Sequence, residues 1–481
     1  MRSLLVSAGR RAGAVVAIAL LGAAATPLET DAATPTAARA AVVHTWSVAV
    51  HRGGADASIR FWRGRAGEAF VDATVSARGV SWDQPKNESA VVSAFVDGHY
   101  VTDIVITSSS PVTRQFALGS LGRGRHTLRL HYAAHRSRSL AGVARLNDVR
   151  ILRTVAPSSP EYAAARYAPV LYGRNLPDLG GRFQNSRTDT PLVAWHQVRP
   201  AATPGHSVIE YSVIWSNEDG GTDTAGLMAR WGRTTDIEWV YRVEVDGQGH
   251  RVAGSGVYQA PAHATLTFHG HYDGTHPLLE TCTANNNVCD KVTDPMRFAL
   301  STREVLPDGQ PREHEMDLHP WTYQVMALEM VREHQIESPS DPATIEVGDQ
   351  RSYLYVAVDH VTSPSTSAGG VGLAVDVQLQ NGMTYKSDHQ QSPLLYTINR
   401  NGPAATTVEL PSGTTSADIA SISVRRAPFL AGDQATLTVT DLNRAFFLGS
   451  TYLPRPSFAQ WHGSVTLTAA APTAQLWPPA G

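Results

Sequence analysis

The sequence predicts a mostly β protein built from two or possibly three antiparallel β-sandwich domains, with one or two short helices. Three observations favour this fold class. Charged residues make up only 17% of the chain, the 39 Gly and 29 Pro residues supply many turns, and Val and Thr recur in short runs of alternating polarity. The length of 481 residues exceeds the usual size of a single core, so more than one domain is expected.

Residues 1–40 have the composition of an export signal. Arg2, Arg10 and Arg11 form a basic start, and the following 14-residue run AGAVVAIALLGAAA is apolar but too short to span a bilayer. Cleavage after Ala25 and cleavage after Ala40 both fit the small-residue pattern. We therefore expect a secreted, extracellular protein without a transmembrane segment after signal cleavage.

The charge of the mature chain bears on its partners. Cleavage after Ala40 leaves 36 basic and 41 acidic side chains, which is a mild excess of negative charge. Nucleic-acid binding usually needs a clustered basic surface, so we expect no nucleic-acid partner.

Residues 41–155 are expected to form an N-terminal β-sandwich. Runs such as ASIRFWR and HTLRLHYA alternate in polarity and are separated by Gly-containing turns. The pattern FVDGHYV followed by LGSLGRGRHTLRLHY resembles the accessory sandwiches of secreted bacterial glycan-active proteins. The aromatic residues of this module serve either as core or as a sugar-stacking platform; they include Trp46, Trp62, Trp82 and Tyr100.

Residues 161–481 are expected to form a β-rich main domain that follows the linker APSSP. The stretch TYQVMALEMVREHQ predicts the clearest helix of the chain, and Pro320 suits its first turn. A further boundary near residue 340 is an alternative. We favour a single unit because no clear linker separates the later strands.

The chain has two cysteines, Cys282 and Cys289, which bracket the hexapeptide TANNNV. In an exported protein this spacing predicts one short disulfide, closing a loop whose Asn residues tolerate turn geometry. The spacing does not favour a redox or zinc role.

The densest group of candidate site residues lies in residues 210–249. Alternation in DIEWVYRVEVD places Asp236 and Glu238 on the same face of a strand, near an acidic loop with Glu218 and Asp219. Paired carboxylates either bind a cation, share acid and base roles, or form a solvated surface. Asp236 and Glu238 are catalytic candidates, and the ligand-binding candidates of this stretch are Trp215, Glu218, Asp219 and Trp239.

Two further polar stretches supply candidates. In FHGHYDGTH, the side chains of His271 and Asp273 are candidates for acid–base chemistry or for a metal, with a solvated loop as the alternative. In EHEMDLHPW, His314 and His319 are candidate ligand-binding residues or catalytic bases. The alternative is that the acids of this stretch only complement the dipole of a helix start.

The central region resembles the Vps62-like and necrosis-inducing (NPP1-type) β-sandwich proteins. YAPV at residues 167–170, Asp236-Ile237-Glu238 and GTHPL at residues 274–278 occur in the order found in those families. Their strand motif Gly-His-Arg-His-Asp-Trp-Glu corresponds to GRTTDIE at residues 232–238, where the glycine and both acids match. The resemblance implies a β-sandwich and a divalent cation near Asp236 and Glu238.

Three functions follow as hypotheses. The first is a protein that binds extracellular carbohydrate or another cell-envelope component. The second is a glycan-active hydrolase or lyase that uses the Asp, Glu and His candidates. The third is a cation-dependent protein that binds membrane lipids. Since the sequence contains no GxSxG elbow, phosphate loop or dinucleotide fingerprint, several common enzyme classes have no support.

Overall fold

The structure is a computed structural model that describes residues 44–152, 154–218, 220, 222–364 and 370–479. It confirms the prediction of a mostly β fold with antiparallel sheets and few helices. The predicted export signal at residues 1–40 and the candidate Asp219 lie outside the described residues. No helix in the described ranges is long and apolar enough to cross a membrane.

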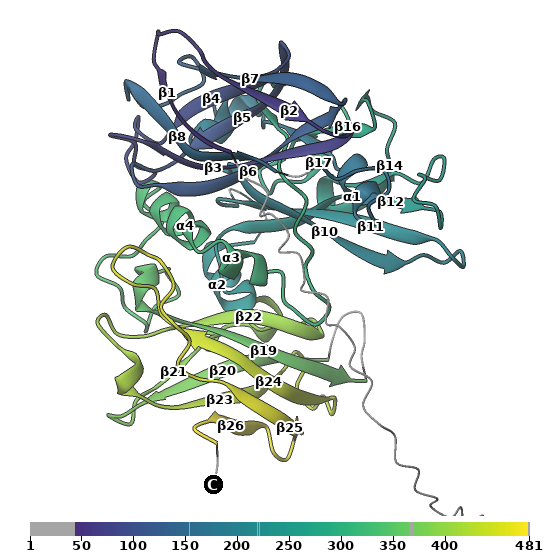
Figure 1. The fold of residues 1–481 in the computed structure, drawn as a ribbon. Helices are drawn as coiled ribbons and strands as arrows, with labels where there is room; N and C mark the ends of the chain where they lie inside the picture. Colours follow the sequence, from purple (N-terminus) through teal and green to yellow (C-terminus); the bar gives the residue numbers. More distant parts are fainter. Residues whose placement is uncertain (1–43, 153, 219, 221, 365–369, 480–481) are drawn as a thin grey trace, which may run out of the picture. The chain divides into compact units, whose positions relative to one another are not determined.

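The first eight strands form two four-stranded antiparallel sheets, ordered β1-β8-β3-β6 and β2-β7-β4-β5 (Figure 1). Their inward-facing side chains form one hydrophobic core, whereas Trp62 on the edge strand β2 is 61% exposed. The strands are β1 Thr45–His51, β2 Ala57–Arg63, β3 Gly67–Ala77, β4 Ala90–Val96, β5 His99–Ile106, β6 Val112–Leu121, β7 Gly124–Tyr132 and β8 Val143–Ile151.

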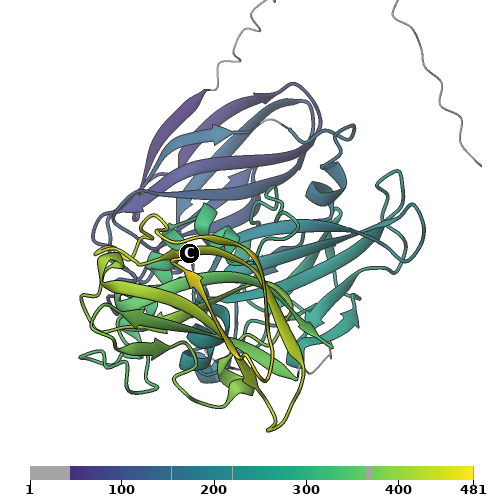
Figure 2. The same ribbon diagram turned by 90° about the horizontal axis from the view of Figure 1, so that it is seen from below.

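The central strands form two five-stranded sheets. One is ordered β10-β11-β12-β13-β14, and the other is β15-β16-β9-β18 with β17 paired to β16. In both Figure 1 and Figure 2 the β10–β11 hairpin extends beyond its neighbours. The strands are β9 Val170–Tyr172, β10 Pro191–Pro200, β11 Ser207–Trp215, β12 Asp236–Val245, β13 Val257–Ala260, β14 Ala264–Thr267, β15 Tyr272–Asp273, β16 His276–Thr281, β17 Val288–Cys289 and β18 Arg297–Phe298.

The helices are short except for α4, which confirms the helix predicted after Pro320. Its Glu329 accepts a hydrogen bond from the buried Trp82 indole at 2.8 Å, so α4 packs against the loop between β3 and β4. The α-helices are α1 Tyr162–Arg166, α2 Thr224–Trp231, α3 His314–Leu318, α4 Trp321–Arg332 and α5 Pro393–Tyr396. The 3-10 helices are η1 Pro177–Leu179, η2 Gln184–Ser186, η3 Pro261–His263, η4 Gln350–Ser352 and η5 Ser416–Asp418.

The last eight strands form two more four-stranded sheets, ordered β22-β19-β24-β25 and β21-β20-β23-β26. Their buried side chains, from Leu354 to Leu476, form a hydrophobic core of their own. The strands are β19 Tyr353–Ser363, β20 Val371–Leu379, β21 Thr384–Lys386, β22 Gly402–Glu409, β23 Ile419–Pro428, β24 Thr436–Phe446, β25 Trp461–Leu467 and β26 Thr473–Trp477.

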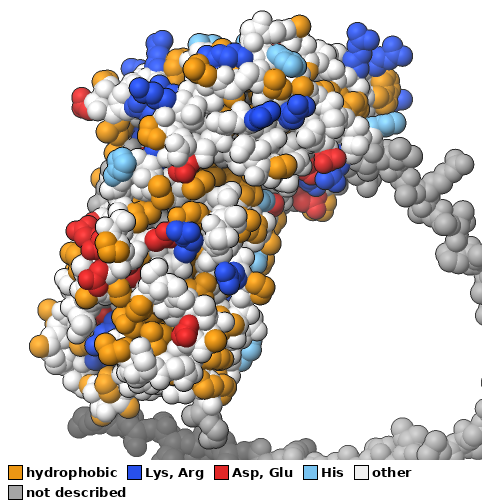
Figure 3. All heavy atoms as spheres, turned by 90° about the vertical axis from the view of Figure 1, so that its left-hand side faces the viewer, with side chains coloured by type: hydrophobic (Ala, Val, Ile, Leu, Met, Phe, Trp, Pro, Cys, Tyr) orange, Lys and Arg blue, Asp and Glu red, His pale blue; other side chains and the backbone are white. Residues whose placement is uncertain are grey.

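The mild net charge hides an uneven distribution of charged side chains. Residues 44–151 carry 14 basic and 8 acidic side chains, whereas residues 353–477 carry 6 and 7. On the face drawn in Figure 3, Lys and Arg side chains are most frequent in the upper part, and hydrophobic side chains are frequent below it. The acidic groups considered below belong to the central region.

Candidate functional site

The candidate site begins at the first residues of β12. Asp236 pairs with Trp215 of β11 in the antiparallel register, and its side chain is buried. Glu238 follows two residues later, so the period of a β-strand directs it to the same face. Its side chain is 17% exposed, which leaves this end of the group accessible from solvent.

Three carboxyl groups influence one another here. Burial raises the pKa of Asp236 well above its ordinary value, and the neighbouring carboxylates of Glu238 and Glu218 raise it further. Burial also raises the pKa of Glu218, with Glu238 adding to the effect, although the Thr222 N–H donates to Glu218 at 2.9 Å. Since three neighbouring negative charges repel one another, the group holds a proton or attracts a cation. We call Glu218, Asp236 and Glu238 the carboxylate group.

The predicted disulfide between Cys282 and Cys289 is confirmed. It closes a loop in which Asn286 adopts a left-handed backbone conformation, with φ of 56°. This side chain lies beside Asp236, where its contact lowers the carboxyl pKa and partly opposes the effect of burial. A Cβ atom added to Gly220 would lie 3.0 Å from the Cβ of Ala284, so the acidic loop and the disulfide loop are in close contact.

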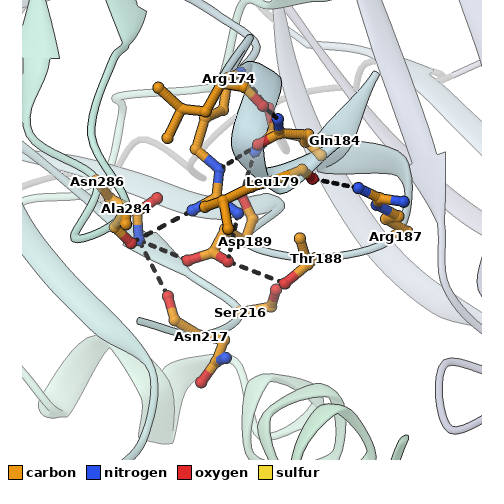
Figure 4. Close-up of polar contacts among 12 residues, drawn as sticks. Arg174, Leu179, Gln184, Arg187, Thr188, Asp189, Ser216, Asn217, Ala284 and Asn286 are labelled. Atoms are coloured by element: carbon orange, nitrogen blue, oxygen red, sulfur yellow. Dashed lines mark hydrogen bonds and ion pairs between the residues drawn. The ribbon is translucent and has the colours of Figure 1, made fainter. Parts of the chain in front are cut away.

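A buried polar network fixes the disulfide loop against the rest of the central region (Figure 4). The Nδ2 atom of Asn286 donates to Asp189 Oδ1 at 2.8 Å and to the Asn217 carbonyl at 3.0 Å. Asp189 also pairs with Arg174 at 3.0 Å, and both side chains are fully buried. Arg174 in turn donates from Nε to Gln184 Oε1 at 2.7 Å. The position of Asn286 therefore depends on residues about a hundred positions earlier.

Two oxygens at the carboxylate group have no hydrogen-bond donor within the described part of the chain. They are Oδ2 of Asp236 and Oδ1 of Asn286, and both are buried. Because the two Nδ2 hydrogens of Asn286 point to Asp189 and Asn217, its oxygen is directed away from those partners. Buried acceptors of this kind require a cation or a donated hydrogen bond. Carboxylate and amide oxygens are the ligands that Ca²⁺ and Mg²⁺ prefer.

One histidine lies beside the carboxylate group, and it is His263 of η3. Its Nδ1 atom is 3.6 Å from Glu238 Oε1, and its side chain is 54% exposed. The Gln259 amide approaches the same nitrogen at 3.0 Å. His263 was not among the site residues selected from the sequence.

The candidates His271 and Asp273 lie elsewhere. Both are exposed at β15, and Asp273 forms an ion pair with Arg297. The segment 268–271 is a connection between β14 and β15, so His271 lies outside a strand. No hydrogen bond or ion pair among the described residues joins His271 or Asp273 to Asp236 or Glu238.

The two tryptophan candidates are parts of the interior. Trp215 is fully buried, and Trp239 is buried beneath Arg242, whose guanidinium carbon lies 3.7 Å from the indole centre. Neither indole has an exposed ring face that could stack on a ligand.

The candidates His314 and His319 lie at α3 and do not belong to the carboxylate group. His314 is half-buried, and burial together with the charge of Arg444 lowers the pKa of its imidazole. His319 follows the last residue of α3, and its Nε2 atom lies 2.6 Å from Glu304 Oε2.

No protein-family model matches the chain, and no curated protein matches it. Among solved structures, a family 35 carbohydrate-binding module from an environmental isolate is 12% identical, with 21% of this chain and 72% of that chain covered and a TM-score of 0.16.

Two other similar structures are a CBM36-1 domain and a sugar-binding protein. The first belongs to a multidomain xylanase from the hindgut metagenome of Trinervitermes trinervoides; it is 15% identical, covers 23% of this chain and 85% of its own, and has a TM-score of 0.17. The second is the EclA C-terminal domain, which is 14% identical, covers 25% and 87%, and also has a TM-score of 0.17. TM-scores this low establish neither a common fold nor a common function.

Proposed function

We propose that the mature protein binds extracellular carbohydrate through a divalent cation held by Glu218, Asp236 and Glu238. The observation that carries this proposal is the set of buried oxygens without donors, Asp236 Oδ2 and Asn286 Oδ1, in a group where neighbouring carboxylates raise the pKa of Asp236 and of Glu218. A hard cation such as Ca²⁺ neutralises these charges and accepts both kinds of oxygen.

The accessible end of the group favours a ligand rich in hydroxyl groups. Glu238 and Glu218 are partly exposed, so a cation held there keeps coordination positions open to solvent. Sugar hydroxyls are neutral oxygen ligands that replace such water molecules. The exposed Trp62 of the N-terminal strands offers a second surface for a sugar ring.

A second candidate function is hydrolysis of the same class of ligand. The raised pKa of Asp236 is the observation that favours it, because a carboxyl group whose protonated form is favoured can act as a general acid. Its partner would be an ionised carboxylate of the same group, as in glycoside hydrolysis.

The experiment measures Ca²⁺ binding and polysaccharide retention with the protein expressed without its first 43 residues. We expect Ca²⁺ binding by calorimetry and retention on at least one polysaccharide that chelation abolishes. Asp236→Asn and Glu238→Gln should each weaken Ca²⁺ binding at least ~10-fold, as is typical when a metal-site residue is lost. Glu244→Gln is the matched control, because Glu244 lies on the same strand but pairs with His206.

The outcomes separate the alternatives. Retention that survives both chelation and Asp236→Asn would disprove the proposal. Release of soluble sugars that is lost in Asp236→Asn would establish the hydrolase instead. Flotation with lipid vesicles in Ca²⁺, without retention on any polysaccharide, would support the third hypothesis of membrane-lipid binding.

A further inference from the structure

A second group of possible metal ligands lies outside the carboxylate group. Glu304, Glu315 and His319 each place one ligand atom within 4.8 Å of those of the other two. Glu315 belongs to α3 and His319 follows its last residue, so the two are four positions apart and share one face of the helical turn. Glu304 comes from the preceding loop. We call these three residues the Glu–Glu–His group.

The main chain holds Glu304 in this position. The carbonyl of Glu304 accepts a hydrogen bond from the His196 N–H at 3.0 Å, and the Leu306 N–H donates to the His196 carbonyl at 3.3 Å. Val305 thereby forms a parallel bridge with His196 of β10. The carboxylate is thus presented by a segment attached to the sheet, and the group is preorganised.

The Glu315 side chain supplies an independent indication of a ligand. It is fully buried, and its only hydrogen-bond contact in the described ranges is with the neighbouring Glu304 carboxyl group. Burial and the neighbouring Glu304 raise the pKa of this carboxyl to about 8. Two carboxyl groups in contact ionise together only at a high cost, unless they share a proton or bind a cation.

A small pocket lies against the group. It has a volume of about 10 Å³, and its lining includes Glu304, His319 and Ser301, together with Thr113 and Gln115 of β6. This is close to the space that one water molecule needs. The pocket therefore leaves room for one water-sized ligand beside Glu304 and His319.

We propose that Glu304, Glu315 and His319 form a binding site for a divalent transition metal of the Zn²⁺ type. An imidazole nitrogen with two carboxylate oxygens is a mixed ligand set that suits Zn²⁺ better than Ca²⁺. Three protein ligands with a fourth, solvent-filled position is an arrangement that zinc adopts in open sites. The site is separate from the carboxylate group and does not depend on the function proposed for it.

The test is a Zn²⁺ titration of the tag-free protein spanning residues 44–481, with Ca²⁺ in excess to occupy the carboxylate group. We expect one equivalent of Zn²⁺, and at least ~10-fold weaker binding in His319→Ala and in Glu315→Gln. His314→Ala is the matched control, since it removes the neighbouring histidine of the same helix and should leave binding unchanged. Asp236→Asn should also leave Zn²⁺ binding unchanged.

Absence of Zn²⁺ binding by the folded wild-type protein would overturn the proposal. Equal binding by wild type and His319→Ala would do the same. If the buried Glu315 variant does not fold, Glu304→Gln replaces it, because Glu304 is 26% exposed. The visible spectrum of bound Co²⁺ gives a second readout, since the change from His319 to Ala should remove the nitrogen ligand and alter the absorption.

Discussion

The carboxylate group and the Glu–Glu–His group contain three titratable ligands each but are held in different ways. Glu218, Asp236 and Glu238 depend on the disulfide loop and on the buried Arg174–Asp189 pair. The other group depends on one turn of α3 and one bridge to β10. We therefore expect metal binding by the first group to be sensitive to distant substitutions. Metal binding by the second group should be sensitive mainly to substitutions of its own ligands.

Asp189→Asn should give the largest effect. The substitution removes the ionic contact between Asp189 and the fully buried Arg174, and breaking a buried pair in this way costs about 3–5 kcal/mol of unfolding free energy. Ca²⁺ binding at the carboxylate group should weaken as well, because Asn286 loses a charged acceptor. Zn²⁺ binding should not change. Urea unfolding and the two metal titrations measure these effects.

Asp273→Asn is the control for that comparison. Asp273 also forms an ion pair with an arginine, but 56% of its side chain is exposed. Exposed pairs contribute ~0–1 kcal/mol, so this variant should retain both its stability and its Ca²⁺ binding. If Asp189→Asn behaves like Asp273→Asn, the buried network does not hold the first group.

Sequence reasoning identified part of the first group because the relevant signal is local. The period of a β-strand was enough to place Asp236 beside Glu238, and the acidic loop earlier in the chain contained Glu218. The two cysteines alone predicted the disulfide. The contribution of Asn286 was not predictable in the same way, since its hydrogen bond to Asp189 spans 97 positions. Arg174 and Asp189 carry no local sign that they form a buried pair.

The second group illustrates the same limit. The spacing of Glu315 and His319 places both on one helical face, and the sequence did select His319. Glu304 reaches them only because its segment bridges to His196 of β10, about a hundred residues earlier. For the fold, alternating runs predicted antiparallel sheets correctly. They did not reveal that Trp215 and Trp239 lie in the interior, because alternation alone does not tell which face of a strand is covered.

The pH dependence of unfolding should separate the groups at an intermediate effect size. The folded-state pKa of Glu315 is about 8, above the value of an exposed glutamate, so the folded state favours its protonated form. In the metal-free protein this contribution to stability is complete at pH values below about 4.5 and is lost as the pH rises through about 8. Glu315→Gln should remove this loss, whose size is set by about 1.4 kcal/mol for each unit by which the folded and unfolded pKa values differ.

Urea unfolding in the presence of a chelator, between about pH 5 and pH 9, measures the slope. Addition of Zn²⁺ should restore the stability of the wild-type protein at the alkaline end and leave Glu315→Gln unaffected. Parallel curves for the two proteins in chelator would mean that the pKa of Glu315 is not raised in the folded state. That result would contradict the prediction.

The smallest expected effect concerns the histidines of the two groups. His263 lies 3.6 Å from Glu238 but is 54% exposed, whereas His319 is 13% exposed and lies 2.6 Å from Glu304. An exposed contact of this kind contributes ~0.2–1 kcal/mol, so His263→Ala should change Ca²⁺ affinity by less than ~5-fold. His319→Ala, in contrast, removes a proposed ligand and should weaken Zn²⁺ binding at least ~10-fold.

A loss of Ca²⁺ binding in His263→Ala as large as that in Asp236→Asn would make His263 a ligand. The first group would then also have a mixed ligand set, and its expected preference for Ca²⁺ over Zn²⁺ would have to be reversed.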